Sequence, residues 1–161
     1  MSREGAPSAR IAWITIAALA WWGGGALGHV AAGGDAIAII VAKERQASAI
    51  NLSDLGRIYR GEQETWEDGQ KILVVNQGLE SEIRKRFYQL VLKSEPAQKF
   101  LRPGTPLPFQ TTVFKSDRTI RKFVAATPNA IGYVSAAEVD DSVQVLAIEG
   151  ARPDDGRYPL K

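Results

Sequence analysis

The alternation of short apolar runs with amphipathic stretches limits the fold of this chain more than any other feature. The runs at 36–41 (AIAIIV) and 72–75 (ILVV) are nearly continuous, as expected of strands covered on both faces. Amphipathic helical stretches follow each of them, opening near Leu52 and Ser81. The resulting β-α-β-α-α-β-β order predicts an α/β fold with a mostly parallel or mixed sheet flanked by helices.

The stretch from 116 to 134 predicts a helix, a tight reversal and a strand. Ser116 is expected to cap a helix that stops before Pro128, because proline cannot continue a helix. Asn129 is expected to take the left-handed conformation in the reversal. Residues 130–134 (AIGYV) then predict a strand, in which Gly132 leaves room for the close approach of a backbone or a ligand.

Capping and turn residues give further boundaries. Ser53 is expected as the N-cap of the first helix, and Gly61 suits its C-terminal end. Residues 94–101 predict a short helix, 105–112 a loop, and 143–148 a single last strand. Trp66 opens an Asp-Gly turn, where an aromatic plug at the edge of the core is a better interpretation than a ligand platform.

The first 32 residues have the pattern of a secretory signal peptide. Arg3 and Arg10 precede a compact apolar run, 11–22, and small residues occupy 30 and 32. The prediction is a cleaved segment 1–32 and a domain 33–161 outside the cytoplasm, either periplasmic or secreted. An uncleaved anchor is the alternative, because the uncharged run is long enough to span a bilayer.

Composition excludes several classes of function. Removal of residues 1–32 would leave 18 basic and 17 acidic residues. A domain with so small a net charge has no strong positive potential to attract nucleic acid. The only histidine, His29, would also be lost, and the chain has no cysteine. Zinc sites with His or Cys ligands, Cys nucleophiles and Ser-His-Asp triads are therefore excluded. We expect a protein that is not an enzyme and needs no cofactor or metal.

One turn suggests ligand chemistry. The strand 72–75 leads into a helix capped by Ser81, and a helix N-terminus offers free N–H groups to an anion. Glu80 and Glu82 oppose an anion there, so a plain capped helix is the alternative. The candidate ligand-binding residues are Asn76, Gln77, Gly78, Ser81 and Arg84.

Several spaced motifs resemble a known family. The block from 37 to 75, with its LSDLGRIYRG and TWEDG segments, and the TPNAIGYV turn are similar to substrate-binding proteins of phosphate ABC transporters, which are type II periplasmic binding proteins. The family usually has Gly where this chain has Asn129. The resemblance covers 36–160 and implies a single lobe of a two-lobed solute-binding protein. It also implies phosphate or another oxyanion as ligand, and an ABC permease or another membrane or periplasmic protein as partner.

The same resemblance predicts a weakened anion site. The family's serine falls on Ser81, but its arginine falls on Gln77 and its Gly-Thr pair on Glu82 and Ile83. Charge-assisted hydrogen bonds to phosphate are then mostly missing. An exported protein-interaction module that keeps the lobe without binding phosphate therefore stays open beside solute binding, as does pairing of two copies into a homodimer.

Overall fold

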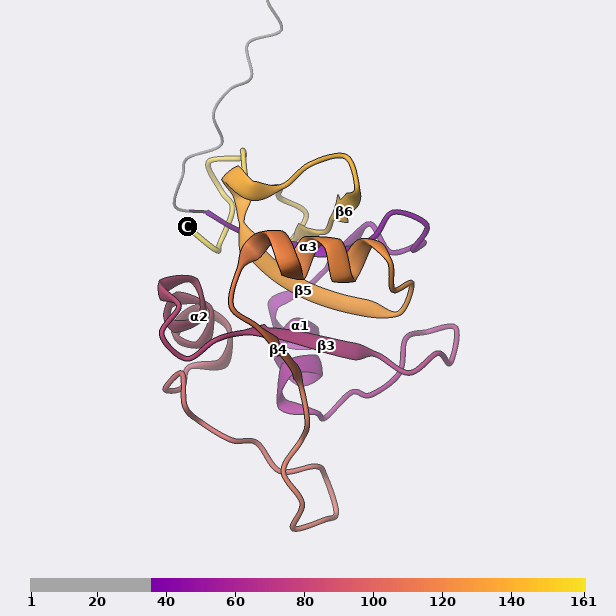
Figure 1. Ribbon diagram of the computed structural model, residues 1–161, viewed down its shortest axis with the longest axis vertical. Helices are drawn as coiled ribbons and strands as arrows, with labels where there is room; N and C mark the ends of the chain where they lie inside the picture. Colours follow the sequence, from indigo (N-terminus) through magenta and orange to yellow (C-terminus); the bar gives the residue numbers. More distant parts are fainter. Residues whose placement is uncertain (1–35) are drawn as a thin grey trace, which may run out of the picture.

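The computed structural model describes residues 36–161, so the predicted signal segment lies outside the described part of the chain (Figure 1). The elements, in chain order, are β1 (Ile37–Ala42), β2 (Ala49–Ile50), α1 (Leu52–Arg60), β3 (Leu73–Gln77), α2 (Glu82–Phe87), the π-helical turn η1 (Tyr88–Leu92), β4 (Thr112–Phe114), α3 (Asp117–Ala125), β5 (Ala130–Ser135), the 3₁₀ turn η2 (Ala136–Glu138), β6 (Val143–Val145) and β7 (Ala147–Ile148). None of the helices within 36–161 is both long enough and apolar enough to cross a membrane.

A five-stranded mixed sheet, in the order β4-β3-β5-β1-β6, forms the centre of the molecule. Strand β3 is parallel to β4 and β5, whereas β1 is antiparallel to both β5 and β6. Strand β1 therefore runs against the other four. A separate two-stranded parallel sheet joins β2 to β7. The predicted α/β class, with a parallel or mixed sheet flanked by helices, is confirmed.

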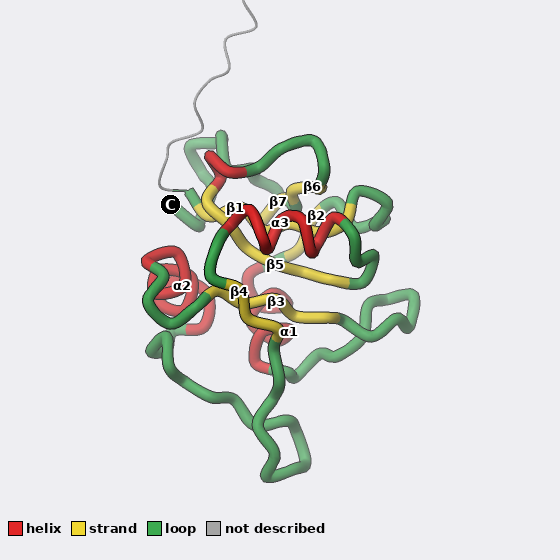
Figure 2. Tube along the Cα trace, viewed as in Figure 1, coloured by secondary structure: helices red, strands yellow, loops and turns green. Residues whose placement is uncertain are grey.

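Helices cover both faces of the sheet (Figure 2). Alternate residues of β1 point to opposite faces, so Ile37 and Ile39 join one apolar cluster while Ala38 and Ile40 join the other. Residues of α1, α2 and η1 fill the first cluster, and Ile120 and Val124 of α3 fill the second. All six residues of β1 are buried, as the continuous apolar run predicts.

Helix α3 packs very closely on β5. A Cβ atom added to Gly132 would lie 3.0 Å from Ile120 Cγ2 and 3.1 Å from Val124 Cγ2. The space that Gly132 leaves is therefore occupied by the helix and not by a ligand. Ser116 caps α3 as predicted, since its hydroxyl accepts a hydrogen bond from Thr119 N at 3.3 Å.

Four local predictions are wrong. The N-cap of α1 is Asn51, two positions before Ser53, because the Asn51 side chain accepts from Asp54 N at 2.7 Å. Residues 94–101 form turns and an extended arm rather than a helix, since residue 101 pairs with 108. The stretch 143–148 divides into β6 and β7, which belong to different sheets. Asn129 lies in a turn without a positive φ, and its side chain donates to Lys71 O.

Candidate functional site

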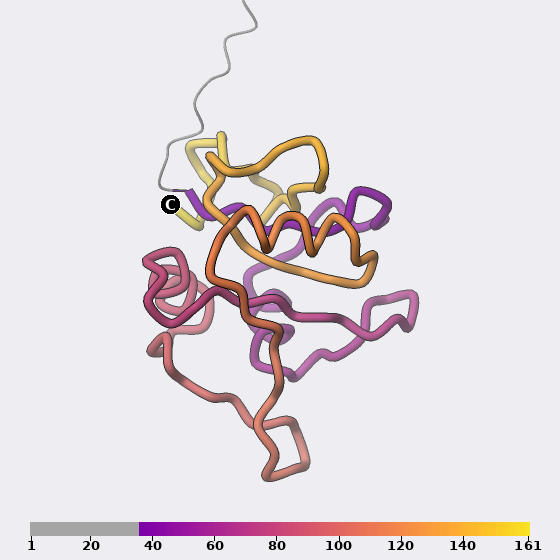
Figure 3. Tube along the Cα trace, viewed as in Figure 1, coloured from indigo at the N-terminus to yellow at the C-terminus, as the bar shows by residue number. Residues whose placement is uncertain are grey.

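The predicted ligand-binding residues lie together at the junction between β3 and α2. Strand β3 ends at Gln77, a turn follows through Gly78, and the Ser81 side chain caps α2 by accepting from Arg84 N at 3.3 Å. In Figure 3 this junction lies where the β3 segment turns into the α2 coil at the left of the molecule. The sequence therefore located the turn and its cap.

Gln77 closes the junction from inside. The residue is 3% exposed, and its side-chain amide nitrogen donates to Asp117 Oδ1 at 2.6 Å and to Tyr133 O at 3.3 Å. The Ser81 hydroxyl donates to the amide oxygen of Gln77. Both polar atoms of Gln77 and the hydroxyl proton of Ser81 are therefore already engaged. An anion could recruit them only by breaking these bonds.

Asn76 lies deeper, beneath two tyrosine hydroxyls. It is 2% exposed, its nitrogen donates to Tyr88 OH at 2.8 Å, and its oxygen accepts from Tyr133 OH. Burial raises the pKa of Tyr133, so this hydroxyl remains a hydrogen-bond donor. Asn76 thus holds the core together and does not face solvent.

Arg84 is a buried cation with neutral partners. Its guanidinium donates to Pro96 O at 2.9 and 2.7 Å, to Gln77 O at 2.6 Å and to Tyr88 OH at 3.1 Å. Its carbon Cζ also lies 4.6 Å from the centre of the Tyr88 ring. No carboxylate within residues 36–161 forms an ion pair with it. Arg84 therefore ties the loop at Pro96 to the end of β3.

The outer rim of the junction contains a cation that the sequence analysis missed. Because β4 pairs with β3 in parallel and Phe114 lies opposite Gln77, Lys115 follows next to Gly78. A Cβ atom on Gly78 would lie 4.0 Å from Lys115 Cγ. Lys115 is exposed, like Glu80 and Glu82 on the same rim. Only the pairing of β3 with β4 brings Lys115 here, and no local pattern reports that pairing.

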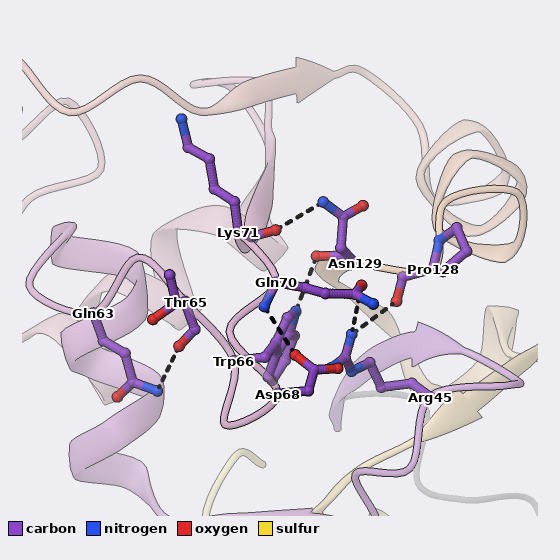
Figure 4. Close-up of polar contacts among 9 residues, drawn as sticks. All are labelled: Arg45, Gln63, Thr65, Trp66, Asp68, Gln70, Lys71, Pro128 and Asn129. Atoms are coloured by element: carbon purple, nitrogen blue, oxygen red, sulfur yellow. Dashed lines mark hydrogen bonds and ion pairs between the residues drawn. The ribbon is translucent and has the colours of Figure 1, made fainter.

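A second concavity, a groove of about 1060 Å³, lies at the opposite end of the sheet. Its walls come from residues 44–51, from Asp54, Ile58 and Gln63, from the turn at 66–68 with Gln70, and from Pro128, Leu146, Glu149 and Gly150. Arg45 is one of its lining residues, and Figure 4 shows its side chain beside Trp66 and Asp68, with the guanidinium Cζ 4.7 Å from the centre of the Trp66 ring. Trp66 is 9% exposed and donates from Nε1 to Asn129 O at 3.1 Å, so it plugs the edge of the core as predicted.

The charges of this groove do not suit an anion. Its lining has five carboxylates, Glu44, Asp54, Glu67, Asp68 and Glu149, and one guanidinium, that of Arg45. Arg45 is itself paired with Asp68. The backbone N–H of Gln70, together with Arg45, holds the pKa of Asp68 below its usual range. The negative field of the groove would repel phosphate, so the rim of the junction is the better candidate for an oxyanion.

Comparison with known proteins gives a consistent picture. A family model described as the PBP superfamily domain matches residues 14–160. A curated relative, the phosphate-binding protein PstS of Bacillus subtilis strain 168, is 30% identical over 122 residues. That match covers 69% of this chain and 37% of the relative, so the chain spans well under half of the relative's length.

Solved structures show the same partial coverage. An ABC-type phosphate transport receptor from Vibrio cholerae superimposes with a TM-score of 0.65 and 26% identity, over 74% of this chain and 48% of the receptor. A putative phosphate ABC transporter substrate-binding protein with bound phosphate, from Clostridium perfringens, gives a TM-score of 0.63 and 26% identity, over 74% and 47%. The chain thus spans about half the length of either structure.

Proposed function

The chain belongs to the PBP superfamily, and from this membership we propose that it is an exported solute-binding protein of the phosphate-transport type, corresponding to about one lobe of those proteins. In this proposal residues 1–32 are a signal peptide and 33–161 are the working domain, which binds a solute rather than catalysing a reaction. The similarity to phosphate-transport receptors over three quarters of the chain supports this assignment.

The observation that carries the proposal is the position of Lys115 beside Gly78, in the turn that leads to Ser81. An oxyanion on this rim would meet one ammonium group and the positive end of a capped helical turn. Gln77, Asn76 and Arg84 would support the rim from beneath, because their polar groups are bound within the protein. Glu80 and Glu82 are exposed on the same rim, and Lys85 is engaged by Glu82 at 2.6 Å. Affinity for phosphate is therefore expected to be millimolar or weaker.

A second lobe would strengthen such a site by enclosing the anion. We propose that an ABC permease, another exported protein or a second copy of this chain supplies that surface. Enclosure would remove water from the rim and increase the contribution of each hydrogen bond to binding.

Calorimetric titration of the exported protein with phosphate and sulfate tests the proposal. We expect weak one-site binding that Lys115→Ala reduces about three- to five-fold, since the variant removes one charge-assisted contact. Lys122→Ala, an exposed lysine on α3, is the matched control and should leave binding unchanged. Equal effects of the two variants would show only a general charge effect and would contradict a site at the rim.

The second candidate, an interaction module without solute binding, is favoured by the closed Gln77–Ser81–Asp117 network. No heat with either anion would support it. Gln77→Arg then separates the two cases, because it adds the missing guanidinium at the junction. If the junction is an anion site, Gln77→Arg should tighten phosphate binding, whereas the same change at exposed Gln46 should not.

A further inference from the structure

A hairpin formed by residues 100–109, here called the tip hairpin, projects from the molecule before β4 (the lower end in Figures 1 and 3). Its two arms are joined by Arg102 N to Leu107 O at 2.9 Å and by Phe109 N to Phe100 O at 2.8 Å. Gly104 has a φ of 75° in the connecting turn, which its lack of a side chain allows. The tip hairpin is therefore a defined structure and not an irregular loop.

Two phenylalanines and an ion pair fix the base of the tip hairpin. Phe109 packs very closely on Gly61. A Cβ atom added to Gly61 would lie 2.5 Å from the Phe109 ring. The ring of Phe100 lies 6.5 Å from that of Tyr88, and Arg102 Nε is 2.9 Å from Glu64 Oε1. The base is thus held against α1 and η1, while the apex extends into solvent.

The apex presents apolar side chains that the core does not use. Leu101 is 59% exposed and Leu107 is 61% exposed, and Val113 of the adjoining edge strand is 51% exposed. Only one other large apolar side chain among residues 36–161, Leu79, is comparably exposed. Three of the four thus lie within one short segment, where exposed leucines gain nothing from burial in the folded monomer.

The charge on this segment has one sign. Residues 96–113 contain Lys99 and Arg102 and no Asp or Glu. Lys99 is exposed, next to the apolar apex. Because Arg102 is paired with Glu64, Lys99 is the free cation among residues 96–113, beside the apolar apex. A convex apolar apex with an adjacent free cation is complementary to a surface with an apolar interior and anionic headgroups. A protein partner would instead need a matching concave pocket with acidic groups.

We propose that the tip hairpin docks the protein onto an anionic phospholipid bilayer, with Leu101 and Leu107 entering the interface and Lys99 contacting the headgroups. Docking would leave the proposed solute rim free, because the tip hairpin precedes β4 and Lys115 follows it. The inference does not depend on the proposed function, since it uses neither Lys115 nor Ser81.

A single fluorophore tests this docking on the whole protein. The chain has no cysteine, so Leu107→Cys gives a unique site for an environment-sensitive dye. Glu67→Cys, an exposed position in the turn that precedes β3, is the matched control and also reports any tethering by another part of the chain. Vesicles of equal parts phosphatidylglycerol and phosphatidylcholine are compared with vesicles of phosphatidylcholine alone.

We expect the label at 107 to shift to shorter wavelengths and to be quenched by brominated lipid in the anionic vesicles only, while the label at 67 stays unchanged. Lys99→Ala should raise the lipid concentration for a half-maximal shift about five-fold, since each lysine near an anionic surface contributes about that factor. Equal responses at 107 and 67, or equal responses to both vesicles, would overturn the proposal. No response at 107 would also overturn it and would leave a protein as the occupant.

Discussion

At the scale of the residue, Arg84 tests whether a buried cation with neutral partners stabilises the fold. Its guanidinium holds the carbonyls of Gln77 and Pro96. Arg84→Met would leave both without these partners, and each buried unsatisfied acceptor costs about 1–3 kcal/mol. We expect the free energy of unfolding to fall by about 2–4 kcal/mol, as measured by urea denaturation.

The control for this variant is Arg118→Met, which removes the same charge from an exposed position on α3. It should change the free energy of unfolding by about 0.5 kcal/mol or less. Arg84→Lys keeps the charge but cannot reach all three acceptors, which are Gln77 O, Pro96 O and Tyr88 OH. Its free energy of unfolding should therefore lie between those of Arg84→Met and Arg118→Met. If Arg84→Met proved as stable as the wild type, the hydrogen bonds of Arg84 would do no more than offset the cost of burying it.

Asp68 connects a single residue to the pH dependence of stability. The backbone N–H of Gln70 and the side chain of Arg45 lower the pKa of Asp68 in the folded protein. A lowered folded-state pKa contributes stability above the unfolded-state pKa, and this contribution is lost as the pH falls through the folded-state value. Asp68→Asn should therefore flatten the acid side of a plot of urea midpoint against pH.

The comparison for Asp68→Asn is Glu67→Gln, which makes the same change in net charge one residue away. The urea midpoints of the two variants should depend differently on pH in the acid range. Near neutral pH the two plots of midpoint against pH should have similar slopes. Identical curves in the acid range would mean that the contacts of Asp68 with Gln70 and Arg45 do not contribute to stability in solution.

At the scale of the element, the contact between α3 and β5 depends on one missing side chain. Gly132→Ala would place a Cβ atom 3.0 Å from Ile120 and 3.1 Å from Val124, so the helix must move outward. Overpacking of this kind costs about 1–3 kcal/mol, measurable by thermal or urea unfolding. Gly156→Ala has no heavy atom within 4 Å of the new Cβ and should have little effect. Equal stability of the two variants would show that α3 moves freely on the sheet.

The elements were predictable where the pattern of apolar residues is local and strong. The continuous run in β1 and the capped helix after Ser116 are both confirmed, with boundaries shifted by about a residue. Competing local signals account for one of the errors. Asn51 and Ser53 are both good N-caps, and the choice between them follows from tertiary packing. The error at 94–101 has another cause, because the pairing of residues 100 and 101 with the second arm of the tip hairpin is not visible as a helical or strand period.

At the scale of the whole molecule, the order and direction of strands were the least predictable features. A buried apolar run is the same in a parallel or an antiparallel strand, so nothing in β1 indicates that it runs against its neighbours. The candidate site was likewise predictable only where it is formed by residues close together in the sequence. Its local part, from Asn76 to Arg84, came from the strand-to-helix turn, whereas Lys115 reaches it through the pairing of β3 with β4. The closed bonding of Gln77 likewise depends on Asp117, which only the folded chain brings near.

The last residues described are hydrogen-bonded to the start of β1 without forming a strand, and this leads to a prediction about the whole fold. Ile37 N donates to Leu160 O at 2.8 Å and Tyr158 OH donates to Ile37 O at 2.7 Å, while Leu160 is fully buried. These bonds hold the start of β1, which lies between β5 and β6. Leu160→Ala should cost about 2–5 kcal/mol and should raise the rate of amide hydrogen exchange at Ile37 above that in the Lys161→Ala control. Unchanged exchange at Ile37 despite lower stability would mean that β1 holds its place without the C-terminal segment, and that the two ends unfold independently.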